Sequence, residues 1–477
     1  MRSTNTPRDW EPLLARLQRV ADTPADDAVA AIVGDWSTLP SDASAQALRD
    51  AHEEQWKRLG QATALLNTLG PNGKLEHWQA EAPHVDADLR QVVQDFIHAQ
   101  QALPAWADSA KLQRAETLFV EYGPLSCILL FCASLPECYV LPDLAAVLHR
   151  AGQLEQHTEY RIRSTAAMIF PVMMRGGLSD ADGSGRGQIL KVRLIHATIR
   201  NLILHGHPHR AFDGPDAATA RVVAPHPALA AEPGMFAAMF AGGWDAGRSG
   251  VPCNQEELAY TLLTFSFVFL RGLRRLGLGL SAADEEAYLH CWNVAASVLG
   301  VDDALMAHSM DEAQILFDAM QARVRGPAPA QDPRPALGRA LMQAMEQAIP
   351  VGWLKPLASL MTRYLCGRRT AALIGVDARA SGFSRVLFEL LISTARLIDT
   401  LARRIWPQFS LSRLITRTLG YHLVTRLLMD QTRSLRLPTQ LLGHADALLD
   451  SWAEDSQAPR WVNALEDRLT TSGSWKD

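Results

Sequence analysis

Apolar residues recur at spacings of three and four along most of the chain, which is the repeat of an amphipathic helix. The clearest stretches span residues 45–69, 87–102 and 258–276. Leucine and alanine dominate the apolar positions, and runs of β-branched residues that alternate with polar ones are absent. Because these residue types favour helices over strands, the pattern predicts an all-α protein.

Glycine- and proline-rich segments interrupt this helical pattern. Residues 176–187 (GGLSDADGSGRG) predict a flexible loop, and residues 326–335 (GPAPAQDPRP) predict a linker. We therefore expect three parts: an N-terminal helical region at residues 1–103, a core at residues 104–325 and a C-terminal helical region at residues 337–477.

The overall composition is that of an ordinary globular protein. The chain has 477 residues, of which 48% are hydrophobic, and a formal net charge of -5. These values exclude global disorder, and they favour no nucleic-acid partner, which usually needs a clustered basic excess. Six cysteines are too few for a disulfide framework, so we expect them to be reduced. No apolar leader follows the first charged residues, which predicts a cytoplasmic location.

The charge is unevenly distributed, because residues 351–440 contain 14 lysines or arginines and four acidic residues, a net charge of +10. Arginines alternate there with apolar stripes, as in residues 388–398 and 403–406, which is typical of a basic amphipathic helix. Two interpretations remain open at this stage. The region contacts an anionic membrane surface, or its helices pack on the core and their arginines are solvated or paired with acidic groups elsewhere.

The helix predicted over residues 189–204 carries the most informative side chains. Arg193, His196 and Arg200 are three and four residues apart, so they share an arc of about 60 degrees on one helix face. Their neighbours Ile189 and Ile203 are apolar, so the face should be buried, and buried guanidinium groups need anions. Either protein carboxylates or an anionic cofactor such as haem would meet that need, and haem iron would take the imidazole as a ligand.

A second predicted helix places Arg161, Thr165 and Met168 on one face, one turn apart. These side chains could line a pocket wall and hold water or bound oxygen. Alternatively, the threonine bonds its own helix and the arginine forms a structural ion pair. A loop with three histidines, at positions 205, 207 and 209, is a weaker candidate for a divalent metal ion, because no carboxylate or cysteine lies at ligand spacing.

These motifs, in this order and spacing, resemble the latex-clearing protein and mpaB-type oxygenase family. The resemblance is good over residues 104–320 and fainter over residues 22–31 and the C-terminal region. It rests on Arg161-x-x-x-Thr165, the glycine-rich loop, Val192-Arg193-Leu194-Ile195-His196-Ala197-x-x-Arg200, Asn254-Gln255-Glu256-Glu257-Leu258, and Phe267-x-x-x-Arg271-Gly272-Leu273-Arg274-Arg275-Leu276-Gly277.

The resemblance implies an all-helical haem b protein with a globin-like core, in which residues 104–325 form the catalytic, haem-binding part. His196 matches the proximal iron ligand, Arg161 and Thr165 match pocket positions, and Arg193 and Arg200 fall in the motif around the ligand. The haem would be noncovalent, because no C-x-x-C-H motif is present. We expect Arg193 and Arg200 to neutralise the haem propionates or to support the helix that carries His196.

The implied reaction is oxidation of a hydrophobic, isoprenoid- or lipid-like substrate by dioxygen or peroxide. Two departures from the rubber-cleaving members bear on this reaction. Ser164 stands where those members have a lysine that closes the distal iron site, and their distal glutamate base has only Asp143 and Glu155 as offset counterparts. The alternatives are a noncatalytic haem-binding protein and a haem-free, membrane-associated helical scaffold.

Overall fold

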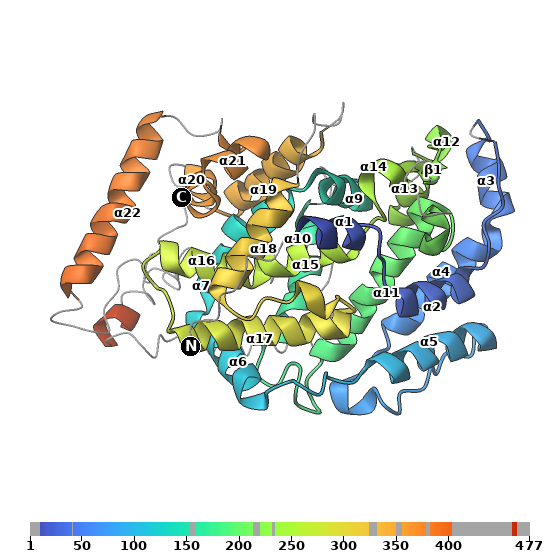
Figure 1. Cartoon of the computed structure of the whole chain (residues 1–477), viewed down its shortest axis with the longest axis horizontal. Coiled ribbons are helices and arrows are strands. Elements are labelled where there is room, and N and C mark those ends of the chain that lie inside the picture. Colours follow the sequence, from blue (N-terminus) through green and yellow to red (C-terminus); the bar gives the residue numbers. More distant parts are fainter. Residues whose placement is uncertain are drawn as a thin grey trace.

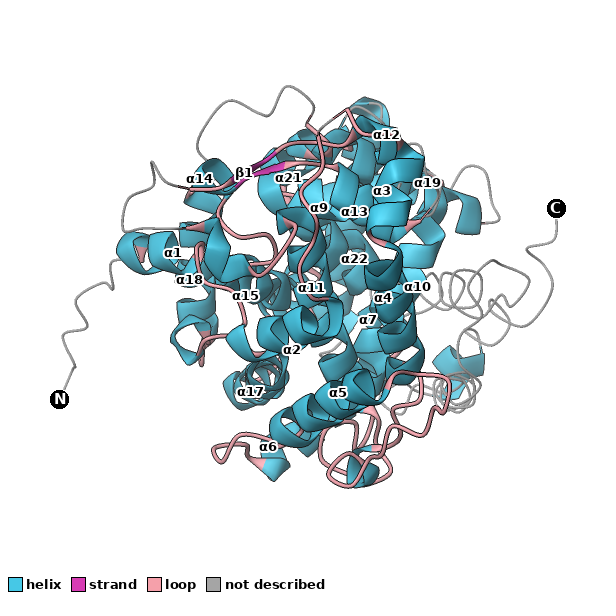
Figure 2. Cartoon of the chain, turned by 90° about the vertical axis from the view of Figure 1, so that its right-hand side faces the viewer, coloured by secondary structure: helices cyan, strands magenta, loops and turns pink. Residues whose placement is uncertain are grey.

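The computed structural model is all-α, as the hydrophobic pattern predicts (Figures 1 and 2). It describes residues 10–40, 42–152, 158–212, 220–230, 234–323, 332–349, 355–377, 382–402 and 460–464. In these ranges the extended structure consists of one isolated bridge and two short strands, β1 (Val222–Val223) and β2 (Trp244–Asp245), which pair antiparallel. The predicted linker lies largely outside the described residues.

The helices of the first half run from the N-terminus to the segment that carries the candidate site. They are α1 (Glu11–Leu17), α2 (Thr23–Val33), α3 (Ala45–Ala51), α4 (Glu53–Leu66), η1 (Asn72–Lys74), α5 (Ala87–Gln100), α6 (Ser109–Tyr122), α7 (Pro124–Leu129), η2 (Leu130–Ser134), α8 (Leu135–Cys138), α9 (Pro142–Gly152), α10 (Thr158–Met173) and α11 (Gly185–Leu204).

The remaining described helices complete the body and extend to one edge of the molecule in Figure 1. They are η3 (Pro208–Ala211), α12 (Pro227–Ala230), α13 (Met235–Ala241), α14 (Ala246–Ser249), α15 (Gln255–Phe265), α16 (Phe267–Arg275), α17 (Ala282–Leu299), η5 (Asp303–Leu305), α18 (Met310–Ala322), α19 (Arg334–Ala348), α20 (Pro356–Cys366), α21 (Arg368–Leu373) and α22 (Gly382–Ala402).

Two helices that the apolar pattern predicts as continuous are broken. The stretch 258–276 divides at Ser266, where the hydroxyl bonds back to the carbonyl of Leu262 at 2.9 Å, an arrangement that often bends helices. The stretch 45–69 divides at His52, whose ring turns away to the carbonyl oxygen of Ser37 at 3.1 Å. In both places a side-chain hydrogen bond accompanies the break, and the spacing of apolar residues gives no sign of it.

A single cluster of buried apolar side chains runs from Leu14 on α1 to Phe388 on α22. Helix α11 lies among the other helices and packs against α2, α10, α13 and α17 (Figure 2). All six cysteines are buried free thiols, as expected from their number. All three predicted parts of the chain contribute side chains to this cluster. The division of the chain into three parts stays a prediction.

The glycine-rich segment between α10 and α11 is held in place by a second loop. The side-chain amide of Asn72 donates to the carbonyl oxygens of Gly177 and Asp180 at 2.8 and 3.0 Å, and its oxygen accepts from the backbone of Arg186. Gly183 is required by close approach, because a Cβ there would lie 2.1 Å from the carbonyl oxygen of Gly176. The segment is thus a fixed turn that leads into α11, which begins at Gly185 rather than after Gly187.

The described part of the chain contains no single helix that is long and apolar enough to cross a bilayer. One pair of helices reaches that length only by combining Ser109–Tyr122 with Pro124–Cys138 across a bend of 90°.

Candidate functional site

Helix α11 presents the three side chains that the sequence places on one face. Arg193 and Arg200 are 5% and 0% exposed, and His196 lies between them. The helix ends at His205, which adopts a left-handed conformation with φ of 48°. The predicted juxtaposition of an imidazole and two guanidinium groups inside the protein is therefore present.

Arg193 pairs with the carboxylate of Asp22, the residue that precedes α2. Its Nε and Nη2 atoms donate to the two carboxylate oxygens of Asp22 at 2.6 and 2.8 Å. Its Nη1 atom donates to the side chain of Gln100 and to the carbonyl oxygen of Val298, both at 3.0 Å. Such a forked pair fixes both partners in orientation as well as in charge.

Arg200 is held one turn further along α2. Its Nε donates to Asp26 at 2.7 Å and its Nη1 donates to the carbonyl oxygen of Cys253 at 3.0 Å. Both side chains are almost completely buried, and burial raises the pKa of Asp26 to about 6 although Arg200 opposes the shift. Removal of this pair from water is therefore costly, and the two charges depend on each other.

The sequence leaves two kinds of anion as partners for Arg193 and Arg200, protein carboxylates or an anionic cofactor, and these contacts distinguish between them. Protein carboxylates, not a cofactor, neutralise Arg193 and Arg200. Of the two roles that the sequence leaves open for these arginines, the contacts with Asp22 and Asp26 support the second, which is to fix the helix that carries His196. Binding of haem propionates by Arg193 and Arg200 stays a prediction.

His196 is enclosed by the fold but has an open bonding position. Its Nδ1 atom is buried and has no hydrogen-bond partner, whereas part of the residue's surface remains accessible. Burial, assisted by the charge of Arg200, lowers the pKa of the imidazole to about 3. The ring is consequently neutral at physiological pH, which is the form that ligates iron.

Helix α10 packs along α11, and a short connection, residues 174–184, returns the chain from one to the other. Thr165 and Met168 are half-buried on α10, whereas Ser164 is exposed. The side chain of Arg161 and the whole of Glu155 lie outside the described residues. The pocket roles of Arg161 and Thr165 stay predictions.

Several buried acidic groups escape sequence reasoning. Asp22 and Asp26 give no local sign of burial beyond the faint family resemblance over residues 22–31. Glu257 on α15 is buried with Oε2 unpartnered, and burial together with nearby Asp143 raises its pKa well above the usual range. Asp143 itself accepts a hydrogen bond from Ser249 at 2.8 Å, and burial raises its pKa. The helical repeat alone gives no reason to bury these carboxyl groups.

The histidine-rich loop does not form a common metal site. His205 is directed to the carbonyl oxygen of Phe240 at 2.8 Å, while His207 contacts Asp27 at 2.9 Å. Across the ranges that the structure describes, no group of three or more His, Cys, Asp or Glu side chains is arranged to hold a metal ion. A haem iron needs only one of these side chains from the protein, so His196 is judged on its own geometry.

Residues 215–397 match the family model described as the catalytic domain of the ER-bound oxygenase mpaB/B' and rubber oxygenase. The chain is also 24% identical to the rubber oxygenase of Streptomyces sp. strain K30 over 331 residues, which cover 68% of this chain and 69% of that protein. Both matches support an assignment to the mpaB and rubber oxygenase family. The family resemblance of the motifs is thereby confirmed.

A solved structure of the latex-clearing protein in its closed state has the same fold. It superposes with a TM-score of 0.56 and 19% identity, covering 92% of this chain and 91% of that one. The family model begins at residue 215, after the end of α11, so it does not include Arg161, Thr165 or His196. The assignment of these residues therefore rests on motif spacing and on the contacts described above.

Proposed function

We propose that this mpaB and rubber oxygenase family member is a haem b-dependent oxygenase that oxidises a hydrophobic, isoprenoid- or lipid-like substrate with dioxygen or peroxide. The observation that carries the proposal is His196, a neutral imidazole with an unpartnered buried Nδ1 on a helix that two ion pairs fasten to the start of α2. A buried polar atom without a partner is costly, so its retention calls for a ligand.

The residues around His196 fit noncovalent haem. Ile199 and Ala197 are buried apolar neighbours of the kind that a macrocycle needs, and His196 itself is partly accessible. Bound haem would supply an iron centre that activates dioxygen, chemistry that protein side chains do not provide. The structure supports an iron ligand here and assigns no partners to the propionates.

The protein's own contribution is to hold the imidazole neutral and in one orientation. The pairs Arg193–Asp22 and Arg200–Asp26 lie one turn before and after His196 and fasten α11 to α2. The positive charge of Arg200 disfavours a proton on the ring, so the lone pair stays available. In the proposal, the Thr165 hydroxyl and the Arg161 guanidinium of α10 orient the oxidant by hydrogen bonds.

The names of the relatives support the substrate class in this proposal. The curated relative is named for rubber, a hydrocarbon polymer, and the family description includes an ER-bound oxygenase. Both support a lipophilic substrate for this chain. We include in the proposal a cytoplasmic chain that contacts the membrane peripherally through residues 351–440, where such a substrate dissolves.

The test is the absorption spectrum of the full chain expressed with a haem precursor, together with a pyridine haemochrome assay. We expect a Soret band and about one haem per chain, as a single protein iron ligand predicts. His196→Gln should abolish it, whereas His52→Gln should not, although His52 is also buried with an unpartnered Nδ1 and a pKa lowered by burial. An unchanged spectrum in His196→Gln would refute the ligand assignment.

Oxygen uptake separates the catalytic proposal from its alternative. We expect the haem-loaded chain to consume dioxygen when lipophilic isoprenoids are supplied in detergent. Haem binding without oxygen consumption across such substrates would favour a noncatalytic haem-binding protein. Absence of haem after reconstitution would leave a helical scaffold.

A further inference from the structure

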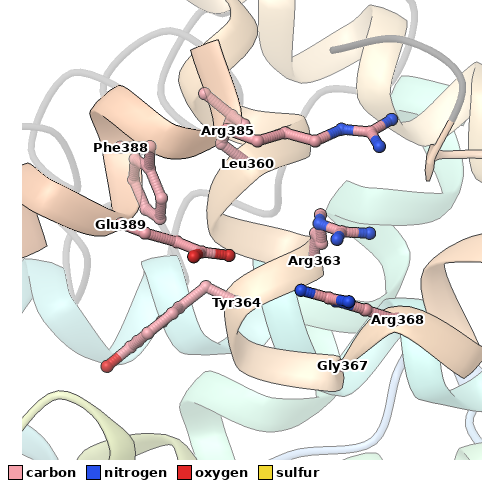
Figure 3. Close-up of a pocket in the computed structure, with 8 residues that line it drawn as sticks. All are labelled: Leu360, Arg363, Tyr364, Gly367, Arg368, Arg385, Phe388 and Glu389. Atoms are coloured by element: carbon pink, nitrogen blue, oxygen red, sulfur yellow. The ribbon is translucent and has the colours of Figure 1, made fainter. Parts of the chain in front are cut away.

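A pocket of about 160 Å³ lies where α22 meets α20 and α21, far from α11 along the chain (Figure 3). Three guanidinium groups, two aromatic rings and one carboxylate surround it. Its lining comes from Leu360, Arg363, Tyr364, Gly367, Arg368, Arg385, Phe388 and Glu389.

The positive charges at this pocket are only partly neutralised. Arg363 and Arg385 both form ion pairs with Asp377, the second at 3.8 Å. Arg385 also donates to the Asp377 carbonyl oxygen, while its Nε atom has no partner. Arg368 is exposed and, among the described residues, has no carboxylate within ion-pair distance. Glu389 lies beside Phe388 on the opposite side of the cavity (Figure 3). Three arginines therefore face two carboxylates, and donors remain for an incoming anion.

The exposed face of α22 next to this pocket is apolar. Val386, Leu390 and Leu397 are 68%, 62% and 59% exposed, and their spacing places them within about 40 degrees of one another on the helix. Phe388 and Ile392 lie on the opposite face and pack on the core. Single exposed leucines are common, but a stripe on one helix face marks an interaction surface. Figure 1 shows α22 at the edge of the molecule.

The two features match one partner, an anionic lipid bilayer. A bilayer presents phosphate groups at its surface and hydrocarbon just beneath, so a cationic pocket beside an apolar stripe is complementary to it. Arginine suits phosphate because its planar fork donates two parallel hydrogen bonds. A groove for a protein helix would not require three arginines at its end.

We propose that the α20–α22 pocket binds the phosphate of an anionic membrane lipid while Val386, Leu390 and Leu397 enter the bilayer. This inference rests on the membrane contact included in the proposed function and gives it a defined site, but it does not depend on haem. The α22 surface would then bring the enzyme to the phase in which a lipophilic substrate dissolves.

The test is flotation of the full chain with phosphatidylcholine vesicles, with and without phosphatidylglycerol. We expect binding to the anionic vesicles and about a fivefold loss of it in Arg368→Gln, the usual effect of one arginine near the surface. Arg369→Gln is the matched control, because Arg369 is an equally charged, exposed neighbour that does not line the pocket. Equal losses in both variants would show that only general positive charge matters and would overturn the pocket assignment.

A second pair of variants tests the apolar stripe. Leu390→Ser should weaken binding by about tenfold, whereas Ile315→Ser, which changes a similarly exposed residue on α18, should leave it unchanged. All four substitutions are at exposed positions, so circular dichroism should show an unaltered fold. Unimpaired binding of Leu390→Ser would refute insertion of the stripe.

Inorganic phosphate distinguishes a lipid headgroup from a free ion. At matched ionic strength it should compete only weakly, because it lacks the apolar part of the ligand. Tight binding of phosphate alone, lost in Arg368→Gln and without vesicle binding, would show a free-anion site and overturn the proposal, as would a chain that binds neither. Because flotation needs no haem, running it on haem-free and haem-loaded chains separates failure of this inference from failure of the oxygenase proposal.

Discussion

The buried pair of Asp26 and Arg200 offers the sharpest test of how the fold supports the candidate site. Asp26→Ala would leave the Arg200 guanidinium inside the protein with one carbonyl partner, that of Cys253. At 2.7 Å and an effective dielectric constant of about 20, the attraction between the two charges is about 6 kcal/mol. Desolvation offsets most of it, as the raised pKa of Asp26 indicates.

The cost of breaking the pair should therefore greatly exceed its net contribution. We expect Asp26→Ala to lower the free energy of unfolding by about 3–5 kcal/mol, because an uncompensated buried charge remains. In the double variant Asp26→Ala with Arg200→Met no charge remains, and most of the loss should be recovered. If α11 must be fastened to α2 for His196 to bind iron, haem retention should follow the same order as stability: the original chain first, then the double variant, then Asp26→Ala.

The assay is urea unfolding of haem-free protein followed by far-ultraviolet circular dichroism. Asp35→Ala is the control, since it removes an exposed partner of Arg210 and should cost less than about 1 kcal/mol. The reasoning would be refuted if Asp26→Ala cost no more than Asp35→Ala, or if the double variant were no more stable than Asp26→Ala.

Three further predictions concern other parts of the fold. Burial lowers the pKa of His205 from 6.5 to about 4, so its contribution to the free energy of unfolding is fully present above pH 6.5 and falls by up to about 3 kcal/mol as the pH drops toward 4. His205→Asn, in which asparagine tolerates the left-handed backbone, should reduce this loss of stability at acid pH. Urea unfolding measured between pH 7 and pH 4 tests this, and an unchanged pH dependence would contradict it. Gly183→Ala should destabilise the protein by about 1–3 kcal/mol, because the new Cβ would clash with backbone atoms. Gly60→Ala, in the middle of α4, should stabilise it slightly, because nothing lies within 4 Å of the new Cβ. Thermal unfolding should show the two opposite shifts in Tm. Glu137→Ala should cost about 3–5 kcal/mol because it leaves Arg271, 2.5 Å away, unpaired, and a loss below about 1 kcal/mol in urea unfolding would contradict this.

The sequence alone predicted much of this protein. Its apolar repeat determined the all-α class, because a helix buries one face and the residues on that face recur every three or four positions in the sequence. The same repeat placed Arg193, His196 and Arg200 together, since residues three and four apart on one helix are neighbours whatever surrounds it. Motif order was enough to suggest the family whose model matches residues 215–397.

Only the tertiary structure decided what those side chains contact. Asp22 and Asp26 lie more than 170 positions from their arginines, and no local pattern pairs groups at that separation. The breaks at His52 and Ser266 coincide with side-chain hydrogen bonds, to Ser37 and Leu262, that the apolar repeat does not predict. The burial of Glu257 depends on how α15 packs. Helical periodicity specifies which face of a helix is buried. The side chains that contact this face come from an element far away in the sequence. The neutralisation of Arg193 and Arg200 and the unpartnered Nδ1 of His196 therefore arise only when the helices pack together.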